Sequence, residues 1–205
     1  SEFDGSPVHL GIGSATQLKR IEDNRLPPAV SPEGTLEDPH WSPDGTRLLV
    51  SMDPLSFSGI QGATEQSIYL VDPSEKHIAR LTKGKGKSTR SVWISPTAFI
   101  YNLQTERGTS LRFSTIDGTL DEELASTKHP QEEISPVSVS PDGRYIVYVQ
   151  YGDPSPSSGY PYGTLRILDL HTRVSRVITE GTNPQQMFVG WRAQPSSDGA
   201  STHDS

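Results

Sequence analysis

Short apolar segments recur along most of the chain, and clusters of Pro, Gly, Asp and Ser separate them. Residues 48–50, 68–71 and 146–149 are examples that consist of Val, Ile, Leu and Tyr. Runs this short, bounded by turn formers and rich in β-branched and aromatic residues, are typical of β-strands. An amphipathic helix would instead show an apolar period of 3.6 residues. The pattern therefore predicts an all-β chain of many short strands.

One pattern occurs twice, because residues 39–50 match residues 137–148. In both copies a short strand leads into Ser-Pro-Asp-Gly, at residues 42–45 and 140–143, and a second apolar strand follows. Pro presets φ for the second position of a type I turn, Asp can accept hydrogen bonds from nearby amides, and Gly tolerates a positive φ. Each copy therefore predicts a β-hairpin.

Further copies extend the repeat. A shortened copy without Asp-Gly lies at residues 91–102, and residues 187–192 resemble the first strand of another copy. The equivalents of one repeat position are 53, 45 and 52 residues apart, and they are Ser42, Ser95, Ser140 and Arg192. A period near this length belongs to β-propeller blades of four strands.

The second half of each blade is also repeated. A β-rich strand closes on an Asp, namely Asp72, Asp117 or Asp169, and a more polar strand follows. The complete repeat predicts three four-stranded antiparallel blades. Their predicted bounds are about residues 39–83, 91–126 and 136–180.

The order Trp-Ser-Pro-Asp-Gly, apolar strand, Ile-Tyr-Leu-Val-Asp, Arg-Leu-Thr resembles the WD40-like (PD40) repeat of TolB-like β-propellers. The same repeat occurs in the propeller domains of prolyl-oligopeptidase and dipeptidyl-peptidase relatives. The resemblance covers roughly residues 37–192 and implies a β-propeller. It implies no single function, because the family is a scaffold used for many tasks.

The chain ends carry fragments of a further blade. Residues 7–21 resemble two outer strands and residues 186–193 an inner strand, so the ends are expected to share a fourth blade that closes the ring. Two alternatives stay open: the chain is a piece of a larger propeller, or two copies close one ring as a homodimer. The propeller domain is thus expected at residues 7–193. Residues 1–6 are interpreted as a cloning remnant and residues 194–205 as a flexible tail.

Composition narrows the function classes. The formal net charge of −7 and the pI of about 5.3 disfavour nucleic acid as a partner. The chain has no Cys, which excludes disulfides, zinc–thiolate sites and thiol nucleophiles. No apolar stretch approaches the ~20 residues of a membrane span.

No complete catalytic or metal-binding motif is present. A Gly-x-Ser-x-Gly nucleophile elbow is absent, and Gly86-Lys87-Ser88 lacks the earlier glycine of a phosphate-binding loop. Residues 83–87 are better interpreted as a solvated loop between two blades. The six histidines are scattered, without metal-ligand spacing. The sequence therefore predicts no cofactor, no metal and no catalytic residues.

Binding is expected on the face formed by three connections, at residues 52–65, 103–109 and 150–163. Tyrosines among Pro, Ser and Gly resemble adaptable binding loops, although packing on their own blade is the alternative. Residues just before the first strands are expected on the same face. The candidate binding residues are Tyr151, Tyr160, Tyr162, His40, Arg90 and Gln186. Trp41, Trp93 and Trp191 are interpreted as packing between blades.

These observations predict a non-catalytic scaffold that binds a protein, a peptide or another ligand, with carbohydrate as an alternative ligand. The resemblance suggests an extracytoplasmic location, and the domain would act as the sensor or interaction part of a longer protein. The alternative is the propeller domain of a peptidase or a polysaccharide-active enzyme whose catalytic part lies outside this chain.

Overall fold

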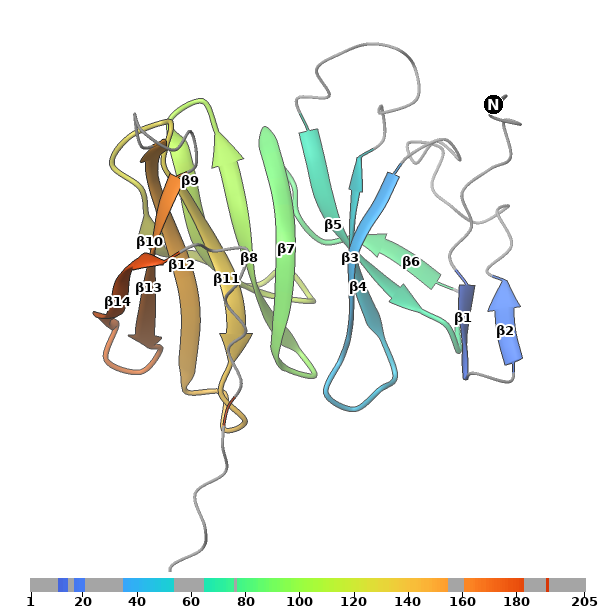
Figure 1. Cartoon of the computed structure of the whole chain (residues 1–205). Helices are drawn as coiled ribbons and strands as arrows, with labels where there is room; N and C mark the ends of the chain where they lie inside the picture. Colours follow the sequence, from blue (N-terminus) through green and yellow to red (C-terminus); the bar gives the residue numbers. More distant parts are fainter. Residues whose placement is uncertain are drawn as a thin grey trace, which may run out of the picture.

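The computed structural model describes residues 11–14, 17–20, 35–53, 65–75, 77–154, 161–182 and 191. These residues form strands and turns, as the apolar pattern predicted, and they include no helix (Figure 1). The described part therefore provides no helix that could span a membrane.

Twelve of the strands form three antiparallel sets of four, which we call the first, second and third blade. The first blade consists of β3 (Thr35–Trp41), β4 (Leu48–Asp53), β5 (Glu65–Asp72) and β6 (His77–Arg80). The second consists of β7 (Gly86–Ser95), β8 (Ala98–Thr105), β9 (Gly108–Thr115) and β10 (Asp121–Ser126). The third consists of β11 (Glu133–Val139), β12 (Tyr145–Pro154), β13 (Pro161–Asp169) and β14 (Val174–Thr182).

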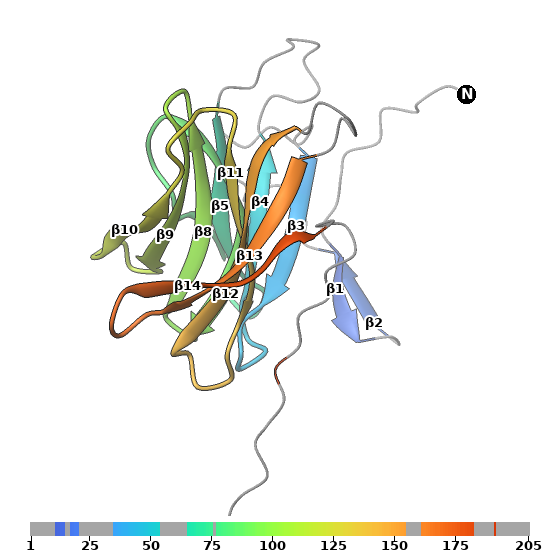
Figure 2. The ribbon, with the colours of Figure 1, turned by 60° about the vertical axis from the view of Figure 1, so that its left-hand side comes forward.

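The second blade lies between the other two (Figures 1 and 2). Its first strand β7 contacts both β3 and β11, so the three first strands are neighbours. A short parallel ladder also joins β5 to β7, with Glu65 opposite Gly86 and Gln66 opposite Lys87. The N-terminal ends of these three first strands therefore lie close together on one side of the blades.

Each first strand begins three to five residues before the predicted start of its blade. The cause is a register shift in each strand, at Glu37/His40, Thr89/Val92 and Pro136/Ser138. The sequence repeat covers only the part after these β-bulges. His40 and Arg90 consequently lie inside β3 and β7 instead of before them. The predicted loop at residues 83–87 likewise ends earlier, because Gly86 and Lys87 belong to β7.

The Ser-Pro-Asp-Gly turns have the predicted chemistry. The Ser42 hydroxyl donates to Asp44 and accepts from the Arg47 amide at 2.9 Å. Gly45 and Gly143 have φ values of 68° and 70°, which glycine adopts without strain. A third turn of this kind joins β9 to β10, where Thr115 replaces the serine.

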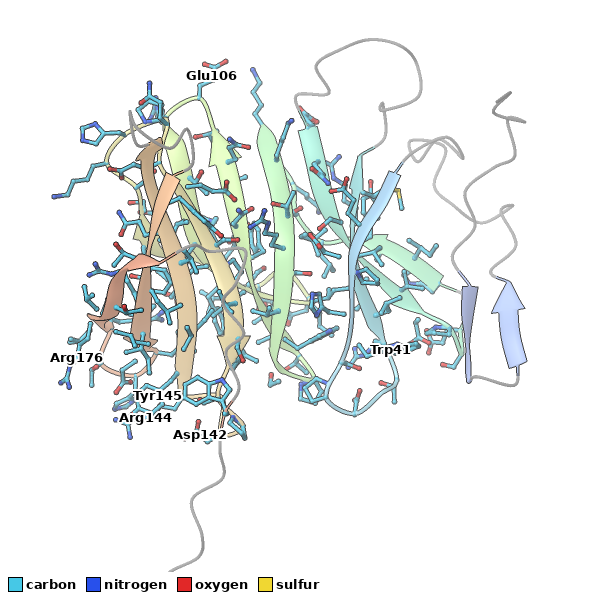
Figure 3. The ribbon with its side chains drawn as sticks, viewed as in Figure 1. Trp41, Glu106, Asp142, Arg144, Tyr145 and Arg176 are labelled. Atoms are coloured by element: carbon cyan, nitrogen blue, oxygen red, sulfur yellow. The ribbon has the colours of Figure 1, made fainter. Side chains whose placement is uncertain are left out.

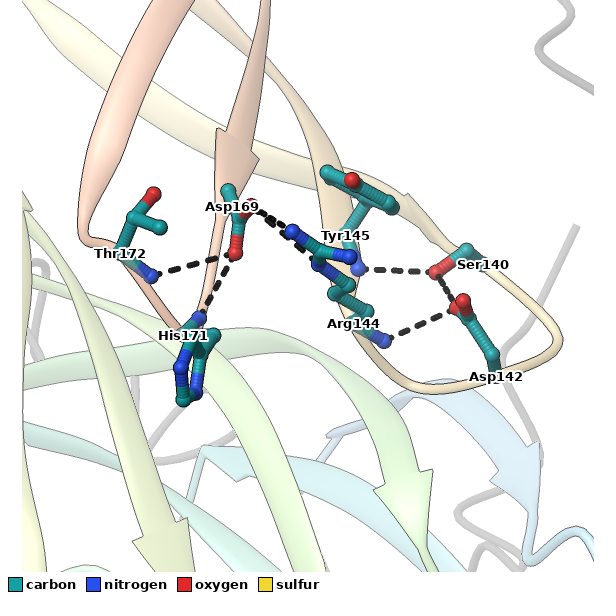
Figure 4. A network of polar contacts seen from close by, with 7 residues as sticks. All are labelled: Ser140, Asp142, Arg144, Tyr145, Asp169, His171 and Thr172. Carbon is teal, nitrogen blue, oxygen red and sulfur yellow. Dashed lines mark hydrogen bonds and ion pairs between the residues drawn. The ribbon is translucent and has the colours of Figure 1, made fainter.

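In the third blade the turn continues into a polar network (Figure 4). Asp142 accepts from the Arg144 amide at 3.0 Å, and the Arg144 guanidinium pairs with Asp169 at 2.8 Å. Asp169 also accepts from the His171 amide at 2.9 Å. The hydrogen bond from Arg144 is the main cause that lowers the pKa of Asp169 to about 2. This network lies at the opposite end of the blades from the β8–β9 turn, which Glu106 marks in Figure 3.

The apolar core lies between blades. Leu49 and Ile68 of the first blade pack with Trp93, Phe99 and Tyr101 of the second. On the other side of the second blade, Ile100 and Leu111 join a cluster from the third, which contains Ile134, Ile146, Tyr148 and Leu168. Successive residues of β8 thus alternate between the first blade and the third blade, as the two-residue period of a strand requires.

Two tryptophans make equivalent hydrogen bonds across the repeat. Trp93 Nε1 donates to the carbonyl oxygen of His40, and Trp191 Nε1 donates to the hydroxyl of Ser138, each at 2.9 Å and across 53 residues. Trp93 is 8% exposed and packs between blades, as predicted. Trp41 is 47% exposed, because no blade of the described part precedes the first blade (Figure 3).

The chain ends do not form a closed ring within the described residues. β1 (Gly11–Ser14) and β2 (Gln17–Arg20) pair only with each other. Of residues 186–193, the structure describes Trp191 alone, which packs against Val147, Val149 and Leu165 of the third blade. Residues 1–6 and 194–205 lie outside the described residues. The shared fourth blade therefore stays a prediction.

Candidate functional site

A cleft of about 550 Å³ opens where the three first strands begin. Every described residue that lines it is polar or charged, and these residues come from all three blades. The lining residues are Glu37 and Asp38 of β3, Gln66 of β5, Lys87, Thr89 and Arg90 of β7, Asn102 and Gln104 of β8, and Glu133 of β11.

Two of these residues occupy the same structural position in adjacent blades. Asp38 follows Glu37, the last paired residue before the bulge of β3, and Arg90 follows Thr89 in β7. Their φ values are 49° and 51°, in the left-handed region that non-glycine residues seldom adopt. Such a conformation costs about 1–3 kcal/mol and is concentrated at functional sites. A bulge also redirects a side chain, and here both redirected side chains line the cleft.

Arg90 connects the second blade to the third. Its Nη1 donates to the Ser135 hydroxyl at 2.8 Å and lies 3.5 Å from a carboxylate oxygen of Glu133. Both charged side chains are more than 40% exposed, so the ion pair contributes little to stability. Its effect is to fix the direction of the guanidinium at the cleft.

Tyr151 lies beside this pair, because it is opposite Glu133 in the ladder of β11 and β12. Burial raises the pKa of Tyr151, and Glu133 acts in the same direction. The charge of Arg90 and a hydrogen bond from it oppose this rise in pKa. The structure therefore brings together two of the predicted binding residues, Tyr151 and Arg90.

Hydrogen bonds also hold lining side chains of β3, β5, β7 and β8 in place. Gln66 Nε2 donates to Glu37 at 3.0 Å. The Thr89 hydroxyl donates to the side-chain oxygen of Asn102, whose amide nitrogen donates to the Ile134 carbonyl at 3.3 Å. These contacts fix the walls before any ligand arrives.

Three of the lining side chains have no polar contact of their own among the described residues. Asp38, Lys87 and Gln104 make no side-chain hydrogen bond or ion pair with any residue that the structure describes. They are the groups that the cleft offers to a ligand without breaking an existing contact.

The other predicted binding residues have different places. His40 is exposed on β3 beyond the bulge and is not among the lining residues. Tyr162 belongs to β13, but its side chain is outside the description, as are Tyr160 and Gln186 entirely. Of the three predicted connections, the one at residues 103–109 is mostly strand, because β8 and β9 leave only Glu106 and Arg107 in the turn. Residues 54–64 and 155–160 of the other two are not described.

The sequence did contain a signal for Asp38. An alignment on Trp41 and Trp93, which lie opposite Leu48 and Phe99 in their ladders, places Asp38 on Arg90. The alignment on Ser42 and Ser95 hides this match, because β7 has a second register shift between Trp93 and Ser95. For Gln66, Asn102 and Gln104, no local motif marks a role in the cleft.

The lining suits recognition of a polar molecule. It supplies three carboxylates, two cations, three amides and one hydroxyl. Within the described residues, no group of three or more His, Asp or Glu could hold a metal ion. The described lining residues would bind a ligand through hydrogen bonds and charge, because none of them offers an apolar side chain to a hydrophobic ligand.

Comparison with known proteins gives a fold. No family model matches the chain, and no curated protein matches it. A solved TolB from Agrobacterium tumefaciens is 17% identical with a TM-score of 0.56, over 80% of this chain and 52% of that protein. A prolyl endopeptidase is 16% identical with a TM-score of 0.62, over 86% of this chain and 26% of that enzyme. An oligogalacturonate lyase in complex with manganese is 14% identical with a TM-score of 0.56, over 80% of this chain and 45% of that enzyme.

All of these neighbours are β-propellers. The matched region spans about half the length of the TolB and less of the two enzymes. At such low identity the likeness concerns the fold alone. The prediction of an all-β chain with the fold of β-propellers is confirmed, whereas the number of blades and the closure of a ring stay predictions.

Proposed function

We propose that this chain is a non-catalytic binding scaffold and that the cleft over its first strands is the binding site. One observation carries the proposal. Asp38 and Arg90, at equivalent bulges of adjacent blades, both keep a left-handed backbone and both line the same cleft. Strain repeated at two equivalent non-glycine positions needs a reason beyond folding, and a shared binding site supplies one.

The construction of the cleft supports the proposal. Three blades contribute to the lining, so one ligand or one segment of a partner would contact all of them. The contacts of Gln66 with Glu37 and of Arg90 with Ser135 hold the walls in advance. Such preorganisation reduces the entropy lost on binding.

Ligand-observed NMR tests this proposal with a panel of short peptides, oligosaccharides and small polar metabolites. The test variant is the double change Asp38→Ala and Arg90→Ala, and the matched control is Arg176→Ala on β14, outside the cleft. We expect at least one class to bind the wild type and the control, and to bind the double variant at least tenfold more weakly. Equal binding by all three proteins would reject the cleft as the site.

A second candidate is the propeller domain of a larger enzyme. It is favoured by the likeness to prolyl endopeptidase, which covers 86% of this chain but only 26% of the enzyme. The cleft would then serve a catalytic part outside this chain. A hydrolase-like segment encoded next to this sequence in its gene would support the enzyme, and a transmembrane helix joined to a regulatory domain would support an extracytoplasmic sensor.

We further propose that a fourth blade closes the ring. The Trp191 indole donates to the Ser138 hydroxyl of the third blade, at the repeat position where the Trp93 indole donates to the His40 carbonyl of the first. Ile178 and Leu124 both lie at the register shift of an outer strand, yet Leu124 packs against the next blade whereas Ile178 is 50% exposed. Among the described residues, no further blade covers this side of the third blade, and a fourth blade would cover it.

Solution mass with small-angle scattering tests the closure. A compact monomer is the expected result. A dimer would support the alternative in which two copies close one ring, and an open wedge would support a piece of a larger propeller.

A further inference from the structure

The charges in the cleft fall into paired and unpaired groups. Glu133 is paired with Arg90 at 3.5 Å, and Glu37 accepts a hydrogen bond from Gln66 at 3.0 Å. Asp38 and Lys87 have no side-chain partner among the described residues. Among the described residues, the cleft therefore presents one unpaired anion and one unpaired cation.

The two unpaired groups come from adjacent blades. Lys87 is opposite Gln66 in the parallel ladder of β5 and β7, and Gln66 donates to Glu37, the chain neighbour of Asp38. Lys87 and Asp38 are thus each next to one partner of the hydrogen bond between Gln66 and Glu37. They form no ion pair with each other, so a gap separates their charged groups.

We infer that the cleft binds a small zwitterion, with the ammonium group of the ligand at Asp38 and its carboxylate at Lys87. This inference rests on the proposed function and adds the chemical class of the ligand. A ligand with one charge gains a single exposed ion pair, which water and salt weaken. A ligand with both charges gains two pairs, and the second forms within the complex at a high effective concentration.

The other lining groups are consistent with this assignment. Arg90 is held by Ser135 and Glu133, so Lys87 is the cation left for the carboxylate. Gln104, also without a side-chain partner among the described residues, adds a donor and an acceptor. Because no described lining residue is apolar, the segment between the two charges of the ligand should be short.

Amide chemical-shift titration of the full chain tests the inference with a graded series. The zwitterions are glycine, β-alanine, γ-aminobutyrate and ε-aminocaproate, and the singly charged controls are butylamine and butyrate. We expect at least one zwitterion to bind tenfold more tightly than both controls. Asp38→Asn should remove its advantage over butyrate, and Lys87→Gln its advantage over butylamine.

These variants are chosen to fold, since Asn tolerates a positive φ and Lys87 is exposed on a strand. Exchanging the charges, with Asp38→Lys and Lys87→Asp together, should restore zwitterion binding. The inference is overturned if no zwitterion exceeds the singly charged controls. Should peptides or oligosaccharides still bind in the cleft, the proposed function survives that result; if nothing polar binds there, both fail.

Discussion

Asp38 and Arg90 occupy the same place in adjacent blades, each next to the register shift of a first strand and each with a φ near 50°. The two residues have opposite charges although their positions in the repeat are equivalent. The bulge is therefore where the otherwise similar blades present different side chains to a ligand. The turns and interblade cores repeat to build the scaffold, whereas the bulges place different chemistry at one cleft. This division of roles leads to the following predictions.

At position 38, a glycine variant should be more stable than an alanine variant. At an ordinary strand position Gly is less stable than Ala, but at a φ of 49° the Cβ of alanine is strained by about 1–2 kcal/mol. We therefore expect Asp38→Gly to have a free energy of unfolding about 1 kcal/mol above that of Asp38→Ala. Urea denaturation measures the difference. Equal stability, or a more stable alanine variant, would show that the bulge is not strained.

Trp41, compared with Trp93, tests the proposed fourth blade. Trp93→Phe removes the indole donor of a half-buried hydrogen bond to the His40 carbonyl and leaves a gap in the interblade core, and it should lower the free energy of unfolding by about 1–3 kcal/mol. Trp41 is 47% exposed among the described residues, but a fourth blade that precedes the first would cover it, so Trp41→Phe should also lower the free energy of unfolding by more than about 0.5 kcal/mol. Thermal and urea unfolding of the two variants give the comparison. A smaller loss for Trp41→Phe would show that no further blade covers Trp41.

Substitution by alanine should destabilise the protein more at Gly143 than at Gly45, although the φ values of the two glycines agree. Alanine is strained by about 1–2 kcal/mol at either position. At Gly143 an added Cβ would also lie 3.3 Å from the carbonyl oxygen of Ile94 in the second blade, whereas at Gly45 nothing lies within 4 Å. Gly143→Ala should therefore be about 1 kcal/mol less stable than Gly45→Ala. Equal denaturation midpoints would contradict the close approach of the second and third blades at this turn.

Acid should weaken the turns in a defined range of pH. Hydrogen bonds, above all from Ser42, lower the pKa of Asp44 from 3.8 to about 2. A carboxylate with a lowered pKa in the folded state stabilises the protein above its ordinary pKa and loses that contribution as the pH falls through its folded pKa. The wild type should thus lose stability relative to Asp44→Asn between about pH 4 and pH 2.

Urea midpoints at several pH values in this range measure that loss. Arg176→Gln, which removes no carboxylate, is the matched control and should follow the wild type. A constant difference between the wild type and Asp44→Asn over the whole range would show that the Ser42 contact does not favour the ionised form.

The sequence predicted the features that depend on neighbouring residues. The turns at residues 42–45 and 140–143 were visible because Ser, Pro, Asp and Gly each act within a few residues. The related turn at Thr115 escaped notice as a copy, since threonine replaces serine and the turn joins different strands. The buried middle strands were equally visible, because their apolar runs are continuous.

The cleft was not predictable in the same way. Asp38 lines it only because β3 shifts register between Glu37 and His40, and a register is set by the partner strand. Gln66 and Lys87 meet through a parallel ladder between two blades, which no local pattern encodes. Arg90 was selected for its place before a predicted strand. It does line the cleft, but through a bulge inside that strand.

The central claim is that this propeller binds its ligand in the cleft over the first strands, and amide chemical-shift mapping tests it most directly. The labelled chain would be titrated with the tightest binder from the peptide, oligosaccharide and zwitterion panels. We predict that the largest shifts fall on residues 37–38, 87–90, 102–104 and 133, and that Asp38→Ala with Arg90→Ala removes them. Shifts concentrated instead on β14 or on the turns at residues 42–45 and 140–143 would contradict the claim.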